Sequence, residues 1–189
     1  MEPLQNNDPL ESRIVLQAHE AQEGIQFLLN QPTLNAMEPT RPGPADQFSL
    51  TGVMESVLHK ADGSALYVRK RNLITNAGFD FIADVIGKNS QPGDMTHIAI
   101  GTAATTAVAT QTALINEATR GTASYSHSAG TKVFTFETTF NPGDGTGALT
   151  ESGVFNASSG GIMLNRVVFS VLNKGASDSL TQRFTFTLA

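Results

Sequence analysis

The sequence contains no cysteine and no tryptophan, and it is poor in charged residues. Without cysteine the chain has no disulfide, no thiolate nucleophile and no cysteine-ligated zinc site. Charged residues make up 15% of the chain, against about 25% in average globular proteins. A formal net charge of -5 offers no positive field to phosphate groups, so we expect no binding to nucleic acid. The one basic run, Arg69-Lys70-Arg71, is interpreted as the solvated end of a strand.

The sequence also lacks a long apolar run and the basic-then-apolar start of a signal peptide. We therefore expect a soluble protein that does not bind membranes and is not exported by a signal peptide. The length of 189 residues fits one domain with an appendage, because single domains commonly contain about 100–200 residues.

Residues 1–30 carry the pattern of an amphipathic helix. Asp8, Pro9 and Glu11 form a helix-start signal in which Asp8 is the N-cap. The apolar residues that follow are spaced by four, four, three, four and three positions, which gives a narrow apolar seam. Two interpretations stay open: the seam packs on the chain's own domain, or it packs on a neighbouring subunit. This candidate interface consists of Leu10, Ile14, Ala18, Ala21, Ile25 and Leu28.

Residues 31–47 are interpreted as an extended linker, because this stretch contains four prolines and has no periodicity. A polyproline-like chain rises about 3.1 Å per residue, so the linker can carry the helix tens of ångströms from the domain. A helix on such an arm is better suited to reaching a partner than to completing a local core. The linker therefore favours the intermolecular interpretation.

Residues 48–189 alternate between apolar and polar positions, which predicts an antiparallel β-sandwich, with one short packed helix. The Asp62-Gly63 pair predicts a tight hairpin, because both residues can accept positive φ. We expect residues 102–112 to form a surface loop, and residues 113–120 to form a short helix or an irregular segment. The expected strands cover residues 49–60, 65–71, 95–101, 122–128, 132–140, 149–157 and 162–172, and a last one runs from Leu180 to Leu188.

The short helix is predicted with Asn76 as its N-cap and Gly87 in the left-handed conformation at its end. Its apolar residues recur at helical spacing, so we expect it to lie on a sheet; they are Phe79, Ile82, Val85 and Ile86.

Alternation also predicts which strand residues face inward. Ile98 and Ile100 share one face, with His97 and Ala99 on the other, and Phe134, Phe136 and Phe140 share the inward face of a later strand. In residues 162–172, Val167, Phe169 and Val171 oppose Arg166, Val168, Ser170 and Leu172. Both faces are partly apolar, which indicates a central strand or one that faces another subunit.

We expect no catalytic, cofactor or metal site. The histidines His19, His59, His97 and His127 have no carboxylate or second histidine at ligand spacing. The glycine-rich run 143–147 lacks the lysine of a phosphate loop and precedes a strand pattern, so it is interpreted as a flexible hairpin loop. Asp62, Asp144 and Asp178 are interpreted as turn formers. The chain is therefore expected not to be an enzyme.

Several motifs between Arg69 and Ala189 carry a family resemblance. They are N-L-I-T-N-A-G from Asn72, I-A-I-G-T from Ile98, then T-A-L and E-x-x-R-G, followed by G-V-F-N-A, M-L-N-R-V-V-F and F-T-F-T-L. This series resembles a module of small virion structural proteins of tailed bacteriophages, of the capsid-decoration or head- or tail-fibre type. The resemblance implies a virion protein that is made in the host cytoplasm and binds the major capsid protein or other virion proteins.

Within that class we favour a capsid decoration, or cement, protein on the capsid surface, because the chain has no long repetitive shaft. An alternative is a tail- or head-fibre base protein, a homo-oligomer that is trimeric through its N-terminal helix. A third interpretation is a carbohydrate-binding module for a host-surface glycan, with a site formed by residues 102–112 and 141–147. It ranks lowest because such sites favour exposed tryptophan or tyrosine, and the chain has only Tyr67 and Tyr125.

Overall fold

The computed structural model describes residues 48–88 and 91–189, which form strands β1 to β10 and helix α2. The predicted helix in residues 1–30 and the linker in residues 31–47 lie outside the described residues.

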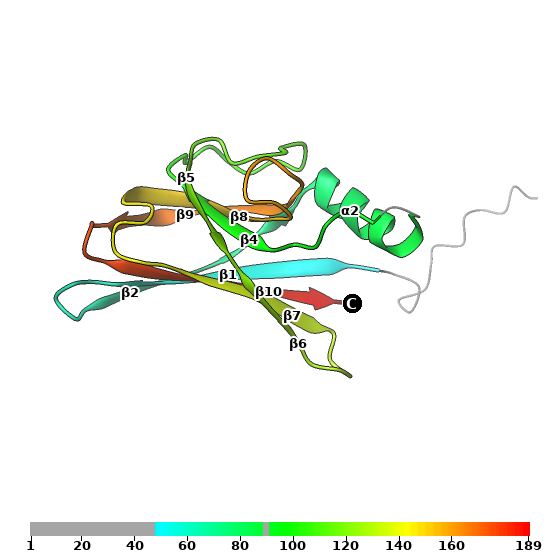
Figure 1. Cartoon of the computed structure of the whole chain (residues 1–189), viewed down its shortest axis with the longest axis horizontal. Coiled ribbons are helices and arrows are strands. Elements are labelled where there is room, and N and C mark those ends of the chain that lie inside the picture. Colours follow the sequence, from blue (N-terminus) through cyan, green and yellow to red (C-terminus); the bar gives the residue numbers. More distant parts are fainter. Residues whose placement is uncertain (1–47, 89–90) are drawn as a thin grey trace, which may run out of the picture. The chain divides into compact units, whose positions relative to one another are not determined.

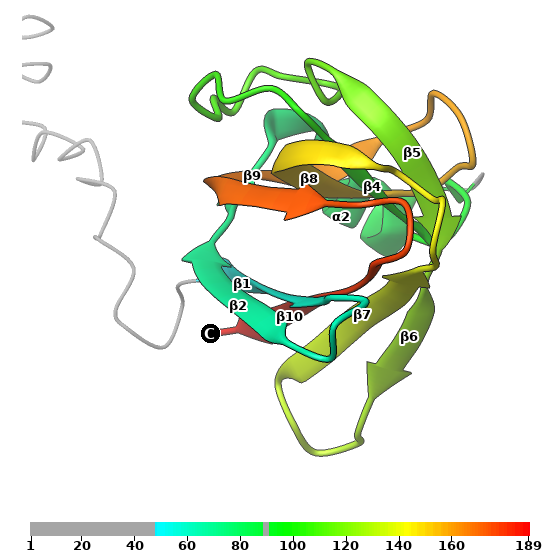
Figure 2. The same ribbon diagram turned by 90° about the vertical axis from the view of Figure 1, so that its left-hand side faces the viewer.

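Two five-stranded antiparallel sheets face each other (Figures 1 and 2), which confirms the predicted β-sandwich. The first sheet has the order β2 (Ala65–Arg71), β1 (Leu50–His59), β10 (Ser179–Leu188), β7 (Val133–Phe140) and β6 (Ser124–His127). The second has the order β3 (Leu73–Ile74), β9 (Met163–Lys174), β8 (Gly147–Phe155), β4 (His97–Gly101) and β5 (Glu117–Thr122). The helix α2 (Asn76–Gly87) follows β3.

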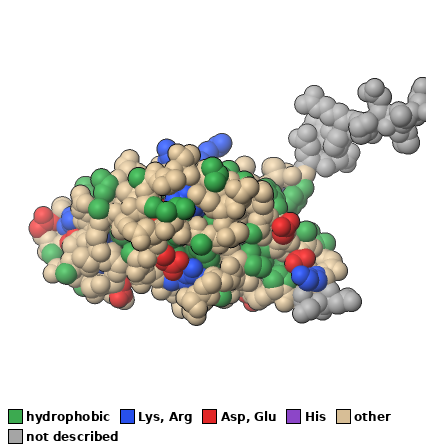
Figure 3. Space-filling view, turned by 90° about the horizontal axis from the view of Figure 1, so that it is seen from above, with side chains coloured by type: hydrophobic (Ala, Val, Ile, Leu, Met, Phe, Trp, Pro, Cys, Tyr) green, Lys and Arg blue, Asp and Glu red, His purple; other side chains and the backbone are tan. Residues whose placement is uncertain are grey.

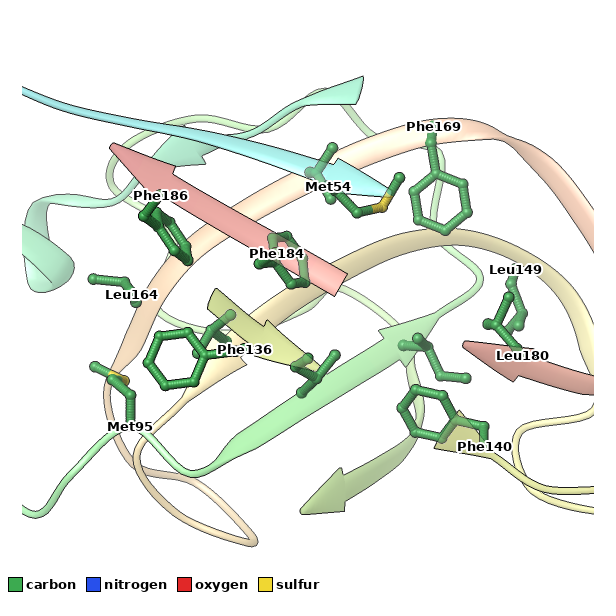
Figure 4. Close-up of a cluster of buried hydrophobic side chains, with 14 of the residues drawn as sticks. Met54, Met95, Phe136, Phe140, Leu149, Leu164, Phe169, Leu180, Phe184 and Phe186 are labelled. Carbon is green, nitrogen blue, oxygen red and sulfur yellow. The ribbon is translucent and has the colours of Figure 1, made fainter. Parts of the chain in front are cut away.

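The main core lies between the sheets and is built from the alternate residues of each strand (Figure 4). Phe184 and Phe186 on β10 are fully buried, and Phe136 and Phe140 on β7 are almost so. Ile98 and Ile100 meet them from the second sheet. These positions confirm the predicted inward faces, because a period of two places every second side chain on one side of a strand.

The outer face of the second sheet is covered as well. A smaller buried cluster of Ala99, Leu114, Phe155 and Met163 lies there, and the Arg120 guanidinium lies 3.7 Å from the centre of the Phe155 ring. Residues 102–116 supply much of this cover. β9 lies between β3 and β8, so the apolar character of both its faces did indicate a central strand.

The predicted strand over residues 122–128 is wrong in one respect: the chain changes sheets within it. β5 ends at Thr122 in the second sheet, and β6 begins at Ser124 in the first. At the crossing, the Ala123 N–H donates to the Thr96 carbonyl at 2.8 Å. Of the expected helix or irregular segment at 113–120, residues 113–116 are irregular, and from Glu117 the chain forms the polar edge strand β5. Residues 141–147 also cross between sheets, from β7 to β8, and so do not form the predicted hairpin loop.

One finer prediction is also wrong. The pairing of β9 with β8 is irregular. Leu172 lies opposite Leu149, and Val168 lies opposite Glu151, so four positions along β9 match two positions along β8. The irregularity reverses the alternation, and Leu172 is buried where Val171 was expected. The predicted hairpin at Asp62-Gly63 is confirmed, since the turn joins the antiparallel pair β1 and β2. Gly63 has a φ of +86°, and the Asp62 carboxylate accepts hydrogen bonds from the backbone N–H and the hydroxyl of Ser64.

Candidate interaction surface

Helix α2 begins differently from the prediction. Thr75, not Asn76, is its N-cap: the Thr75 hydroxyl oxygen accepts from the Gly78 N–H at 2.9 Å and donates to the Met163 carbonyl at 2.5 Å. The helix ends at Lys88 in extended conformation, and Gly87 does not take positive φ. One threonine thus satisfies an orphan backbone donor of the helix and ties the helix start to β9.

The closest approach of α2 to the second sheet is at Gly78. A Cβ at this position would overlap the Leu164 carbonyl of β9, so glycine is required for the contact. Among the described residues of α2, Gly78 alone is buried. Phe81 and Ile82 pack partly against the main core. The expectation that α2 lies on a sheet is therefore confirmed, but over a narrow contact.

Most of the predicted apolar face of α2 is exposed. The fraction of the surface exposed to solvent is 47% for Phe79, 46% for Val85 and 80% for Ile86. Single exposed apolar residues are common on protein surfaces, but three large ones on a helix of twelve residues leave an unusual amount of apolar side chain in contact with solvent. Such a surface is typical of a protein contact.

Beside this helix lies an apolar groove, with a volume of about 630 Å³, which we call the α2 groove. Its lining comes from α2, the beginning of β1 and the end of β10. Figure 1 shows these three segments at the same end of the sandwich. Strands β6 and β7, Leu164 of β9, Ala123 and residues 94–96 before β4 complete its walls. The lining residues are Leu50, Phe81, Ile82, Val85, Asp94, Met95, Thr96, Ala123, Tyr125, His127, Phe134, Phe136, Leu164 and Leu188.

On the outer face of the second sheet a buried ion pair holds residues 102–116 in place. Glu151 on β8 and Arg166 on β9 are fully buried and lie 2.7 Å apart. The Glu151 carboxylate also accepts from the backbone N–H groups of Ala103, Ile115 and Asn116 at 3.3, 3.1 and 2.7 Å.

Arg166 binds the middle of the same loop. Its Nη1 donates to the Thr105 carbonyl at 2.9 Å and to the Gln111 side-chain oxygen at 3.0 Å. The loop prediction for residues 102–112 is correct in type. However, its alanine- and threonine-rich sequence is held by charge-assisted hydrogen bonds rather than by its own packing.

A second polar cluster fastens turns of the two sheets together. Asp178 accepts from the Lys60 ammonium at 2.8 Å, from the Gly175 N–H at 2.7 Å and from the Ala61 N–H at 3.1 Å. The bonds from Lys60 and Gly175 lower the pKa of Asp178 to about 2. Asp178 thus forms its own turn, as predicted, and also binds the β1–β2 turn.

Lys174 is a buried cation at the end of β9, and its ammonium donates to the Asn141 carbonyl at 2.9 Å. Burial lowers the pKa of Lys174. Like Glu151, Arg166 and Asp178, it binds backbone, so each of these buried charged groups fixes a loop or a turn.

The residues singled out in the sequence do not converge on one site. The seam residues Leu10, Ile14, Ala18, Ala21, Ile25 and Leu28, together with His19, lie outside the described residues. His97 is half-buried and hydrogen-bonded to Thr96, as expected of a structural histidine, and His59 and His127 are exposed on the first sheet. Across the described ranges, no group of three or more His, Asp or Glu residues is placed to hold a metal ion.

The apolar groove and the Glu151–Arg166 pair were not found by sequence reasoning. Arg166 was assigned correctly to the face opposite Val167, but nothing in the local pattern says that a loop covers this face. A charged residue among the apolar ones of a central strand was the available signal.

On the face shown in Figure 3, charged side chains are scattered singly or in small groups, and hydrophobic side chains lie in small patches among polar ones. In the part of the chain that the structure describes, no helix is long and apolar enough to cross a lipid bilayer. Comparisons with protein-family models, with curated proteins and with solved structures found no match.

Proposed function

We propose that this chain is a structural protein of a tailed-bacteriophage virion, and that it acts as a capsid decoration protein without enzymatic activity. The observation that carries the proposal is the exposed apolar surface of α2, where Phe79, Val85 and Ile86 are open to solvent and Val85 also lines the α2 groove. This surface suits burial against other proteins of a particle. The motifs that resemble virion proteins supply the kind of particle, and the major capsid protein is the proposed partner.

The internal design supports a mechanical role. Glu151, Arg166, Lys174 and Asp178 bind backbone groups of loops and turns. A domain stiffened in this way keeps its contact surfaces in fixed positions. This matters for a protein that is repeated over a shell, because every copy must present the same geometry to its neighbours.

The proposed mechanism is the sum of many modest contacts. Each copy would bind across neighbouring capsid subunits, and a standard interface of about 1,600 Å² would suffice for a stable contact. Because the contacts are repeated over a closed shell, local opening of the shell would require several of them to break together. The decorated shell would therefore resist internal pressure better than the bare shell.

The experiment that tests this proposal is the copy number of the chain in purified virions, measured by quantitative protein staining against the major capsid protein. We expect about one copy per capsid subunit, or a simple fixed fraction of that number. Absence of the chain from virions would contradict the proposal as a whole. A few copies per particle would contradict capsid decoration and favour a tail- or head-fibre base protein.

The fibre alternative keeps the same surface but places the protein at one vertex or at the tail, as a trimer joined by its N-terminal helices. The carbohydrate-binding alternative is weaker, because neither residues 102–112 nor residues 141–147 contain an aromatic residue. Tyr67 and Tyr125 lie instead on β2 and β6.

A further inference from the structure

The α2 groove lies beside the point where residues 1–47 join the sandwich. Phe48 is 60% exposed, and Leu50, two residues later, lines the groove. The backbone between them is fixed, because Ser49 and Ala189 exchange hydrogen bonds of 2.6 and 3.0 Å. Leu188, next to Ala189, lines the groove as well. The N-terminal segment of each copy therefore starts at the edge of that copy's own groove.

The groove has the chemistry that an amphipathic helix requires. Its walls include Ile82 and Val85 of α2, Phe134 and Phe136 of β7, and Leu188 of β10. Helix-in-groove recognition places residues spaced by three and four positions into such a surface. The seam from Leu10 to Leu28 has this spacing, and its small central residues, Ala18 and Ala21, would allow close approach to the groove.

We propose that the α2 groove of one copy binds residues 10–28 of a second copy. The linker of residues 31–47 argues for exchange between copies, because 17 residues at about 3.1 Å each span about 50 Å. A segment that returned to the groove of its own chain would need much less, since the groove lies beside Phe48. Mutual exchange of these segments between copies related by a rotation axis would close a dimer or a ring.

This inference concerns self-association and does not rest on the virion role. The mass of the purified chain tests the inference, whereas the copy number in virions tests the proposed function, so either can fail while the other stands.

The first test compares two matched variants of the full chain by sedimentation velocity. Val85→Asp places a charge in the groove, and Val108→Asp places one on residues 102–116, at a valine of nearly equal exposure, 46% against 48%. We expect wild type and Val108→Asp to sediment as oligomers. We expect Val85→Asp to fall to the 20.0 kDa monomer, with a far-UV circular dichroism spectrum like that of wild type.

The second test asks whether residues 10–28 of one copy lie in the α2 groove of another. The chain contains no cysteine, so introduced cysteines report a single contact. One preparation carries Ile25→Cys and the other Val85→Cys, and the two are mixed, allowed to exchange and oxidised. We expect a disulfide-linked heterodimer, which the matched pair Ile25→Cys with Val108→Cys does not give.

Three outcomes would overturn the proposal. The first is a wild-type chain that stays monomeric at every concentration. The second is an oligomer that Val85→Asp leaves intact, which would mean that the groove does not hold the copies together. The third is a disulfide that forms within a chain carrying both Ile25→Cys and Val85→Cys but not between mixed chains. That result would mean that the segment binds the groove of its own copy.

Discussion

Replacing Arg166 with methionine should destabilise the protein strongly and release residues 102–116. The guanidinium donates to Glu151 from Nε and Nη2, at 3.0 and 2.7 Å, and from Nη1 to Thr105 and Gln111. Methionine fills part of the same volume and makes none of these bonds. The Glu151 carboxylate would then remain buried without a counter-charge.

The expected loss in the free energy of unfolding is about 3–5 kcal/mol, the range typical of removing one partner from a buried ion pair. Most of it arises from the uncompensated charge, because the Coulomb attraction of the intact pair is largely offset by the desolvation of both groups. Small domains are stable by about 5–15 kcal/mol, so the variant should remain folded but fragile. Lys88→Met is the matched control: it breaks the exposed Asp84–Lys88 pair and should cost at most about 0.5 kcal/mol.

Urea unfolding gives the change in stability, and amide hydrogen exchange locates it. We expect faster exchange at the N–H groups of Ile115 and Asn116, which donate to Glu151. The double variant Glu151→Gln/Arg166→Met removes both charges. Its loss in the free energy of unfolding should therefore be smaller than the sum of the losses in the two single variants. The difference, which is the coupling energy between Glu151 and Arg166, should be about 1–3 kcal/mol.

The reasoning would be refuted by a loss below about 1 kcal/mol in Arg166→Met, or by strictly additive single variants. Either result would mean that the pair is solvated and does not hold the loop.

Two further predictions concern α2 and the turn cluster. Gly78→Ala should cost about 1–3 kcal/mol in thermal or urea unfolding, because its Cβ would meet the Leu164 carbonyl. The control is Gly87→Ala, which should be neutral or slightly stabilising because no atom lies within 4 Å of the added Cβ. An equal loss of stability in Gly78→Ala and Gly87→Ala would contradict a clash with the Leu164 carbonyl as the cause. The pKa of Asp178 is lowered from 3.8 to about 2, chiefly by the hydrogen bond from Lys60. The ionised Asp178 carboxylate therefore stabilises the fold fully above pH 3.8, and this contribution is lost as the pH falls through about 2. Asp178→Asn should therefore be less stable than wild type at neutral pH, by a margin that shrinks across that window in pH-dependent unfolding curves; a constant margin would contradict this.

Local pattern was enough to locate most strands and their inward faces. Phe184 and Phe186 on β10 and Phe136 on β7 are buried as alternation requires, because the strand period is a property of the backbone itself. The β1–β2 and β6–β7 turns lie where Gly63 and Gly130 permit positive φ.

Strand order and the change of sheet at Ala123 could not be predicted. Alternation places Thr122 and Ser124 on the same face of one continuous strand, yet the two residues belong to different sheets. Alternation identifies a buried face but does not say which strand lies opposite or beside it. The shift at β9 that buries Leu172 instead of Val171 has the same cause, since it depends on pairing with β8.

The sequence by itself determined the fold class, the helix between Asn76 and Gly87, and the core-facing residues of most strands, because these follow from local periodicity and turn chemistry. Only the tertiary structure decided what covers the outer face of the second sheet and what stays exposed on α2. Residues 102–116 bury Glu151 and Arg166, whereas α2 leaves Val85 open beside a groove. These arrangements depend on contacts between segments far apart in the chain, which local pattern does not encode.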